Sequence, residues 1–257
     1  MKVRLHVRSG RSETTEFAER LSATLESHGI AADEAAAEAD MVVAVGGDGT
    51  MLSAVELAVA MDVPVLGFNL GTIGFLTAAD PSELEAVSRR LADGDYGLEE
   101  RMTVAATVGG RTIVGVNDVV IEKVDSQRLI ELNVKIDGVE FVNYRADGLI
   151  VATPTGSTAY SFSAGGPLVS PTLHGFVVTA VAALRRFCRM RVILPEDEIL
   201  ITVTRDRPVK VSVDKTGLGQ LGPGDEVSVR RGEKPVQFVT LDPPSFAGLV
   251  RHKFDLP

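Results

Sequence analysis

The residues best suited to chemistry lie at 46–50, where the sequence reads Gly-Gly-Asp-Gly-Thr. The apolar run Met41 to Val45 predicts a short buried strand before this turn, and a helix is predicted from Met51 to Met61. Such a turn presents backbone N–H groups and a helix N-terminus, which favour a phosphate. Asp48 would repel a bare phosphate, so it predicts a metal ligand or a base that takes a proton from an attacking hydroxyl. The alternative is a tight turn in which Asp48 only caps the next helix.

Three further stretches could carry chemistry, namely 69–76, 117–118 and 145–166. Each has a structural alternative. The first could be a plain strand-to-helix turn, Asn117-Asp118 could simply close a turn, Asp147-Gly148 could be a hairpin turn, and Tyr160 could be a core tyrosine. The histidines have no metal-ligand spacing, and the sequence has neither a Walker GKS or GKT triplet nor a Ser-His-Asp order.

Helices and strands alternate before residue 97, which predicts a parallel α/β sheet. Phe17, Leu21 and Leu25 recur every four residues and indicate an amphipathic helix. The predicted elements are a strand at 2–7, a helix at 13–28 ending at Gly29, a loop or short helix at 31–40, a strand at 63–68, and a helix that starts with a Ser82–Glu85 capping box and ends near Gly94.

After residue 97 the pattern is mostly of strands, so the sequence predicts a second, β-rich domain. Gly109-Gly110 and Asp137-Gly138 predict hairpin turns. The stretch 148–166 predicts a strand, a polar loop and a short helix, and 246–254 a last helical turn. Strands are predicted at 103–108, 112–120, 129–136, 139–144, 176–182, 198–204, 208–213, 226–230 and 235–241.

Composition excludes several classes of partner. The formal net charge of -9 argues against a nucleic-acid binder held by phosphate contacts. The single cysteine, Cys188, cannot form an intrachain disulfide and fits a reducing compartment, so we expect a cytoplasmic location. No apolar stretch reaches the ~20 residues of a membrane span, and the N-terminus predicts a strand rather than a signal peptide. We therefore expect neither nucleic acid nor a membrane as partner.

Together the motifs resemble the NAD kinase family, whose members phosphorylate NAD to NADP. The Gly-Gly-Asp-Gly-Thr motif alone is shared with phosphofructokinases and lipid kinases, whereas the block at 146–167 is far more specific. The blocks follow the family order over nearly the whole chain. The matching residues are Gly46–Thr50, Asn69–Gly71, Gly74–Leu76, Asn117-Asp118, Ala146–Gly148, Thr153–Tyr160, Ser163–Pro167 and Phe246–Lys253.

The resemblance implies a Rossmann-like domain at 1–97, a β-rich dinucleotide-binding domain at 98–240, and a C-terminal segment at 241–257 that packs back on the first domain. It also implies a site in a cleft between the domains, with Asp48 as the general base. Asn117 and Asp118 would hold ribose hydroxyls. The residues expected to bind NAD are Gly49, Phe75, Asn117, Asp118, Asp147, Thr158, Ala159, Tyr160 and Ser163, and those expected to bind phosphates are Gly46, Gly47, Gly49 and Thr50.

The implied reaction is phosphoryl transfer to the 2′-hydroxyl of the adenosine ribose of NAD. ATP is the expected donor, inorganic polyphosphate an alternative one, and a divalent ion, Mg²⁺, would screen the phosphates. The family also implies a homodimer or homotetramer. Two other functions remain open, a sugar or lipid kinase and a non-catalytic dinucleotide sensor. A sugar kinase has no evident use for the block at 153–166, and a sensor would not need Asp48.

The sequence departs from the family pattern in two places. Thr179–Arg186 stands where many members carry a segment with proline and histidine, and Asp214-Lys215 stands where an Asp-Gly pair is common. Both places put donor choice, oligomer contacts and affinity in question, but leave the centre at Asp48 intact.

Overall fold

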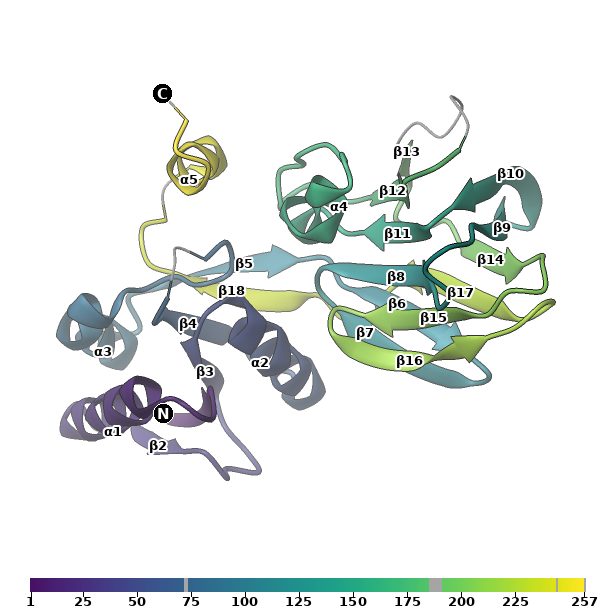
Figure 1. The fold of residues 1–257 in the computed structure, drawn as a ribbon. Coiled ribbons are helices and arrows are strands. Elements are labelled where there is room, and N and C mark those ends of the chain that lie inside the picture. The colour runs from purple at the N-terminus through teal and green to yellow at the C-terminus, as the bar shows by residue number, and fades with distance from the viewer. Residues whose placement is uncertain (72–73, 185–190, 244, 257) are drawn as a thin grey trace. The chain divides into compact units, whose positions relative to one another are not determined.

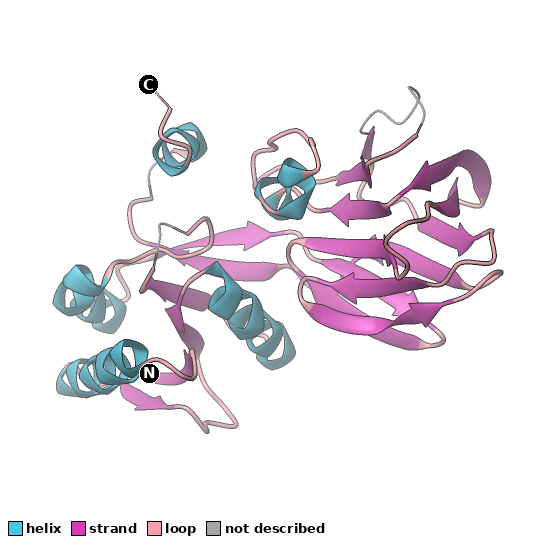
Figure 2. Ribbon diagram, viewed as in Figure 1, coloured by secondary structure: helices cyan, strands magenta, loops and turns pink. Residues whose placement is uncertain are grey.

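The computed structural model describes the chain except for residues 72–73, 185–190, 244 and 257. The chain forms two compact units, Met1–Arg101 with Val236–Pro257, and Met102–Pro235 (Figure 1). Helices are concentrated in the first unit, and the second is built mostly of strands (Figure 2). The predicted fold class, a Rossmann-like α/β domain with a β-rich domain, is therefore confirmed.

The first unit is built on one sheet with the strand order β2-β1-β3-β4-β18-β5. All neighbours are parallel except β18 and β5, which are antiparallel. The strands are β1 (Lys2–Val7), β2 (Ala31–Asp33), β3 (Met41–Gly46), β4 (Val65–Asn69), β5 (Gly97–Arg101) and β18 (Val236–Thr240). The prediction of a loop or short helix at 31–40 missed β2, because three residues are too few to reveal a strand pattern.

Helices α1 (Ser12–Ser27) and α3 (Leu84–Asp93) contact each other and share a hydrophobic cluster with the sheet. The predicted stripe of α1 is correct, because Phe17, Leu21 and Leu25 are all buried. α2 (Asp48–Met61) starts three residues before the predicted Met51, so Asp48 opens the helix. The last helix is α5 (Phe246–Lys253), capped by the side chain of Ser245.

The predicted Ser82–Glu85 capping box is wrong. The box is formed by Asp80 and Glu83, around the short 3-10 helix η1 (Pro81–Glu83) that leads into α3. Glu85 lies on the first turn of α3 and pairs with His28 at 3.0 Å. The cap lies two residues earlier because Pro81 fits the first position of a helix and the chain turns there.

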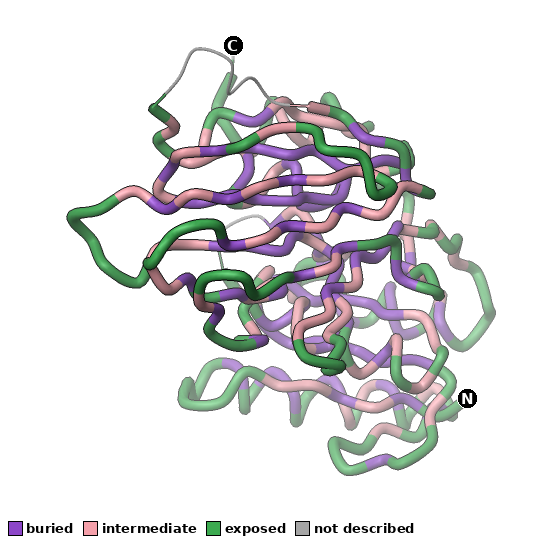
Figure 3. The backbone as a smooth tube through the Cα atoms, turned by 90° about the vertical axis from the view of Figure 1, so that its right-hand side faces the viewer, coloured by how far each residue is buried: buried purple, intermediate pink, exposed green. Residues whose placement is uncertain are grey.

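Within the described residues, the second unit has two antiparallel six-stranded sheets, ordered β10-β9-β14-β17-β6-β7 and β13-β12-β11-β8-β15-β16. Their inner faces share one hydrophobic core, and buried positions alternate with partly buried or exposed ones along strands such as those at 199–203 and 209–213 (Figure 3). The elements are β6 (Val104–Val108), β7 (Arg111–Gly115), β8 (Asp118–Lys123), β9 (Ile130–Ile136), β10 (Val139–Ala146), β11 (Gly148–Ala152), η2 (Thr155–Thr158), α4 (Tyr160–Ser163), β12 (Phe176–Val181), β13 (Arg191–Ile193), β14 (Ile199–Val203), β15 (Val209–Val213), β16 (Thr216–Leu221) and β17 (Glu226–Arg231).

Both predicted hairpin turns are confirmed. Gly109-Gly110 joins β6 to β7 and Asp137-Gly138 joins β9 to β10, each with two residues at positive φ. The strand predicted at 112–120 is instead two strands in different sheets, β7 and β8. Asn117-Asp118 therefore lies where the chain crosses from one sheet to the other. Asp147-Gly148 is not a hairpin turn, since β10 and β11 belong to different sheets.

The chain passes between the units at Arg101–Met102 and at Pro235–Val236, whereas the predicted boundaries lie at 97 and 240. The difference comes from β5 and β18, which pair with each other in the first sheet. No helix in the described part of the chain is long and apolar enough to cross a membrane.

Candidate functional site

Asp48 lies at the carboxyl end of β3, the usual position for a ligand site in a parallel sheet. Its carboxylate is held by two backbone N–H groups of the loop that follows β4. Oδ2 accepts the backbone N–H of Phe75 at 3.0 Å, and Oδ1 accepts that of Leu76 at 3.1 Å. The N-cap of α2 is Gly47, and no side chain caps the helix. The alternative in which Asp48 serves as a helix cap is therefore wrong, and the two N–H groups fix the carboxylate in one orientation.

Gly74 is required for this arrangement. A Cβ built on Gly74 would lie 2.3 Å from Oδ1 of Asp48 and 2.7 Å from Oγ1 of Thr77. Real carbon atoms do not approach oxygen so closely, so any side chain at residue 74 would displace the carboxylate or the loop that holds it. The second motif therefore needs glycine at position 74 because there is no space for a side chain.

The predicted phosphate contacts separate into buried and accessible residues. Gly46 and Thr50 are buried, and a Cβ on Gly46 would lie 2.2 Å from Oγ1 of Thr50. The N–H of Thr50 donates to the carbonyl of Gly47 at 2.8 Å. Gly47 is half-buried and Gly49 exposed, with open space where a Cβ would stand. A phosphate could therefore reach Gly47 and Gly49, whereas Gly46 and Thr50 shape the turn from below.

The second glycine-containing loop begins beside this turn. Asn69, the last residue of β4, is paired in register with Gly46, and the N–H of Leu70 donates to the Gly46 carbonyl at 2.9 Å. Asn69 is buried, and its Oδ1 has no hydrogen-bond partner within the residues that the structure describes. The plain-turn alternative does not account for this loop, because its later residues hold the Asp48 carboxylate.

Phe75 connects the same loop to the end of the chain. Its ring centroid lies 6.0 Å from that of Phe254, and the ammonium of Lys253 lies 5.2 Å from the Phe75 ring. A cation over an aromatic face is attracted by the ring quadrupole. Lys253 at the end of α5 and Phe254 directly after it are therefore neighbours of the segment that binds Asp48.

In the second unit, the Asn117-Asp118 segment packs against the start of the long block. Oγ1 of Thr153 donates to the carbonyl of Val116 at 2.5 Å, and the N–H of Thr153 donates to that of Asn117 at 2.8 Å. A Cβ on Gly156 would lie 2.0 Å from the carbonyl oxygen of Asn117. The structure thus brings together two motifs that are distant in the sequence, since Val116 and Thr153 are 37 positions apart.

Asp118 is buried, with 4% of its surface exposed. Burial, followed by the negative charge of Asp214, raises the pKa of Asp118 to about 7.

Asp214 itself is absent from the predicted site residues. Its carboxylate accepts backbone N–H groups from Val116, Asn117 and Asp118. The sequence marks residue 214 only as the start of a departure from the family pattern, because a contact across two strands leaves no local signal.

The predicted NAD contacts at 158–163 lie on η2 and α4. Tyr160 is 42% exposed and is therefore not a core tyrosine, and Ser163 is exposed as well. Thr158 and Ala159 are half-buried. Two buried hydroxyls of the block are used internally, since Ser157 bonds the backbone of Val169, and Ser161 bonds Thr179. Oγ1 of Thr155 is also buried but has no hydrogen-bond partner among the described residues. A polar and aromatic surface therefore remains for a ligand.

Asp147 lies between β10 and β11 and is ion-paired with Lys123. Its backbone is fixed by two hydrogen bonds, from the N–H of Lys123 at 3.0 Å and to the carbonyl of Val181 at 2.9 Å. The carboxylate thus has a neutralising partner already. A ligand hydroxyl at Asp147 would meet an ion pair rather than a lone charge.

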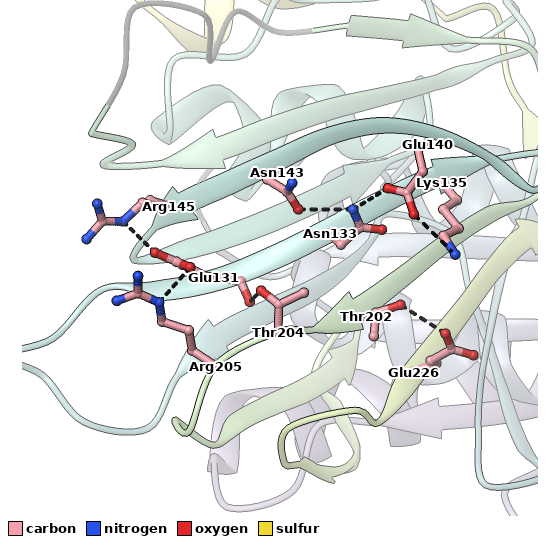
Figure 4. Close-up of a pocket in the computed structure, with 10 residues that line it drawn as sticks. All are labelled: Glu131, Asn133, Lys135, Glu140, Asn143, Arg145, Thr202, Thr204, Arg205 and Glu226. Carbon is pink, nitrogen blue, oxygen red and sulfur yellow. Dashed lines mark hydrogen bonds and ion pairs between the residues drawn. The ribbon is translucent and has the colours of Figure 1, made fainter.

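A polar hollow of about 670 Å³ lies on the outer face of β9, β10, β14 and β17, and none of the predicted site residues lines it (Figure 4). Glu131 pairs with Arg145 and Arg205, each at 2.7 Å, and Lys135 pairs with Glu140. The hollow is lined by three acidic and three basic side chains, so its formal net charge is zero. The lining residues are Glu131, Asn133, Lys135, Glu140, Asn143, Arg145, Thr202, Thr204, Arg205 and Glu226.

Two family models match the chain. The ATP-NAD kinase N-terminal domain covers residues 3–96, and the ATP-NAD kinase C-terminal domain covers residues 116–241. Among curated relatives, the NAD kinase of Corynebacterium jeikeium is 38% identical over 231 residues, which are 87% of this chain and 70% of the relative. The NAD kinase of Nocardia farcinica is 41% identical over 229 residues, which are 87% of this chain and 71% of the relative.

Solved structures give the same result for the fold. A crystal structure of yeast NADH kinase complexed with NADH has a TM-score of 0.89 at 24% identity, over 99% of this chain and 87% of the other. An NAD kinase from Archaeoglobus fulgidus in complex with ATP has a TM-score of 0.81 at 25% identity, over 98% of this chain and 99% of the other.

Proposed function

Because the chain belongs to the ATP-NAD kinase family, we propose that it transfers the terminal phosphoryl group of ATP to the 2′-hydroxyl of the adenosine ribose of NAD. The two family models span both units, and curated relatives at 38 to 41% identity are NAD kinases. Within the structure, the observation that carries the proposal is the fixed carboxylate of Asp48. A carboxylate that two N–H groups hold in one orientation suits a reaction in which a base must accept the proton of one particular hydroxyl group.

Asp48 is assigned the role of general base. A ribose hydroxyl is a poor nucleophile at neutral pH, so a base within hydrogen-bond reach assists as the new O–P bond forms. A carboxylate offers about four lone-pair positions, of which Phe75 and Leu76 use two. The remaining positions can accept the hydroxyl proton without disturbing the contacts that orient the group.

The donor phosphates are assigned to the surface of the same turn. The backbone of Gly47 and Gly49 is accessible there, and the N-terminus of α2 adds its favourable dipole. Gly46 and Thr50 support this turn by packing rather than by contact with the donor. ATP is the donor that we propose, because the family is ATP-dependent. Polyphosphate remains an alternative for experiment.

A divalent ion, Mg²⁺, is proposed to accompany ATP. The described residues contain no group of three or more His, Cys, Asp or Glu side chains that could hold a metal by themselves. Mg²⁺ usually binds through one or two carboxylates together with substrate phosphates, so the single carboxylate of Asp48 fits this ion. When bound, the ion would neutralise charge on the phosphates during transfer. Asp48 can therefore both approach the donor and accept the proton.

The dinucleotide is assigned to the predicted NAD contacts. Asn117 and Asp118 are proposed to bind ribose hydroxyls, and the exposed ring of Tyr160 to stack on a base. Asp147, with its partner Lys123, offers both a carboxylate and an ammonium to polar groups of the ligand. The other residues assigned to NAD are Gly49, Phe75, Thr158, Ala159 and Ser163.

The experiment is an assay of NADP formation by the purified chain from NAD, ATP and Mg²⁺. Parallel reactions replace ATP with polyphosphate, NAD with NADH, and Mg²⁺ with a chelator. We expect NADP with ATP, loss of product with the chelator, and background product with Asp48→Asn. A chain that binds NAD but makes no NADP with either donor would be a sensor, and the proposal would fail.

Assembly is proposed on the resemblance, whereas the location rests on the single cysteine and the exclusion of nucleic acid on the net charge of -9. We propose a homodimer or homotetramer in the cytoplasm, without nucleic acid or a membrane as partner. Light scattering on the purified chain measures the oligomeric state. A mass of 27.3 kDa, that of a single chain, would contradict the proposed oligomer.

A further inference from the structure

Asp214 binds three consecutive backbone N–H groups that lie 96 to 98 residues away in the sequence. Its Oδ2 accepts the N–H of Val116 at 3.0 Å, and its Oδ1 accepts those of Asn117 at 2.9 Å and Asp118 at 3.2 Å. The N–H of Asp214 in turn donates to the carbonyl of Asp118 at 2.8 Å. Hydrogen bonds to an ionised acceptor are stronger than neutral ones, so this carboxylate is a firm anchor.

The anchored segment is held from its other side as well. Thr153 donates to the carbonyls of Val116 and Asn117, and Gly156 packs directly against the Asn117 carbonyl. The N–H groups of 116–118 therefore point to Asp214, and two of the carbonyls point to Thr153. With both sides fixed, the directions of the Asn117 and Asp118 side chains depend on the Asp214 contact.

The local geometry favours this role for residue 214. Asp214 occupies a two-residue hairpin turn between β15 and β16 with φ of 52°, a conformation that most side chains avoid and aspartate tolerates. A Cβ on Gly115 would lie 2.8 Å from Cγ of Asp214. A glycine at 115 therefore lets the carboxylate reach the N–H groups.

We propose that Asp214 is a positioning residue for NAD, which fixes the Asn117-Asp118 turn so that these two side chains meet the ribose hydroxyls. This inference rests on the proposed function, because it assumes that the turn binds NAD. It assigns Asp214 no contact with substrate.

Asp214→Asn is the informative variant, since it keeps the shape of the side chain and one of its two acceptor oxygens. It also removes the negative charge beside Asp118, which lowers the pKa of Asp118. A smaller fraction of Asp118 is then protonated at neutral pH than in wild type. A loss of NAD binding would therefore reflect the position of the turn and not protonation of Asp118.

Asp137→Asn is a matched control. Asp137 also occupies the first position of a two-residue hairpin turn in the second unit, with φ of 47°. Its carboxylate likewise accepts a backbone N–H, that of Glu198 at 2.9 Å. Neither residue belongs to the predicted site, so this control has the same chemistry without the contact to 116–118.

The test compares steady-state kinetics of the two variants. For Asp214→Asn we expect kcat/KM for NAD to fall at least tenfold while KM for ATP stays within twofold of wild type. Asp137→Asn should match wild type. In the Asn117→Ala background, Asp214→Asn should cost much less than in wild type, because both changes act through one turn. Equal effects of Asp214→Asn and Asp137→Asn, or fully additive effects with Asn117→Ala, would overturn the inference.

Amide hydrogen exchange gives a readout that does not need activity. Asp214→Asn should speed exchange at residues 116–118, and Asp137→Asn should not. Unchanged exchange in Asp214→Asn would overturn the inference even in an active enzyme. Absence of NADP formation by the wild-type chain, with faster exchange in Asp214→Asn, would instead refute the proposed function and leave Asp214 as the anchor of the turn.

Discussion

Gly74 and Asp48 lie so close together that a Cβ at residue 74 would be 2.3 Å from Oδ1 of Asp48. The glycine therefore belongs to the machinery that holds the carboxylate, together with the N–H groups of Phe75 and Leu76. Its absence of a side chain is a geometric requirement of the site.

Gly74→Ala should therefore lower kcat by about 10²-fold, the loss expected when a reacting group moves by about 1 Å. KM for NAD should change little, because the methyl group displaces the base and not the proposed ribose contacts. Steady-state kinetics measure both. Gly217→Ala is the control, since a Cβ there meets nothing within 4 Å. Equal turnover in the two variants would refute the steric requirement.

Asp48→Asn should reduce NADP formation by about 10²- to 10⁴-fold, the usual contribution of a general base. One of the two N–H groups, of Phe75 or Leu76, would face the new NH₂ group, so a loss of about 1–3 kcal/mol in stability is also expected. Turnover and melting temperature measured on this one variant separate the two effects. A folded variant with turnover within a few-fold of wild type would remove Asp48 from the mechanism.

Tyr160→Ala should weaken NAD binding about two- to tenfold, since ring stacking contributes roughly 0.5–1.5 kcal/mol beyond area burial. Tyr160 is 42% exposed, so stability should hardly change. Calorimetric titration with NAD measures the affinity. Tyr160→Phe keeps the ring and should bind normally. Phe141→Ala removes an equally exposed ring elsewhere in the second unit and should have no effect. An NAD affinity equal to wild type in Tyr160→Ala would argue against stacking.

The stability of the second unit should depend on the ionisation of Asp118. Its pKa is raised from 3.8 to about 7, so the folded state retains a proton that the unfolded chain loses near pH 4. Stability is therefore lost as pH rises from about 4 to 7 and is constant above that. The shift of about three pKa units corresponds to roughly 4 kcal/mol. Melting temperatures of wild type and Asp118→Asn should diverge with rising pH, to the advantage of the variant. Parallel curves would contradict the prediction.

Much of the fold could be predicted from local patterns. The strand at 2–7, the helix of Phe17, Leu21 and Leu25, and both hairpin turns depend on periodicity or on turn residues, which act within a few positions. The elements missed have weak local patterns. β2 and β13 have three residues each, and β16 is interrupted by Gly217 and Gly219.

The site could be predicted only in part, because its decisive contacts join distant segments. The motif around Asp48 is readable, but its partners Phe75 and Leu76 lie 27 and 28 residues away. The hold of Asp214 on Asn117 spans 97 residues and depends on the pairing of β15 with β8. Strand pairing is a property of the whole fold, so no spacing rule reveals such a contact.

The position of β18 between β4 and β5 in the first sheet has a consequence for synthesis of the chain on the ribosome. β4 and β5 are translated more than a hundred residues before β18, the strand that joins them. Until residues 236–240 emerge, β5 has no strand partner in its sheet among the described residues. The second unit is completed at almost the same point, since its inner strand β17 ends at Arg231, shortly before β18 begins at Val236. A nascent chain should therefore leave β5 open to proteolysis until synthesis is almost complete.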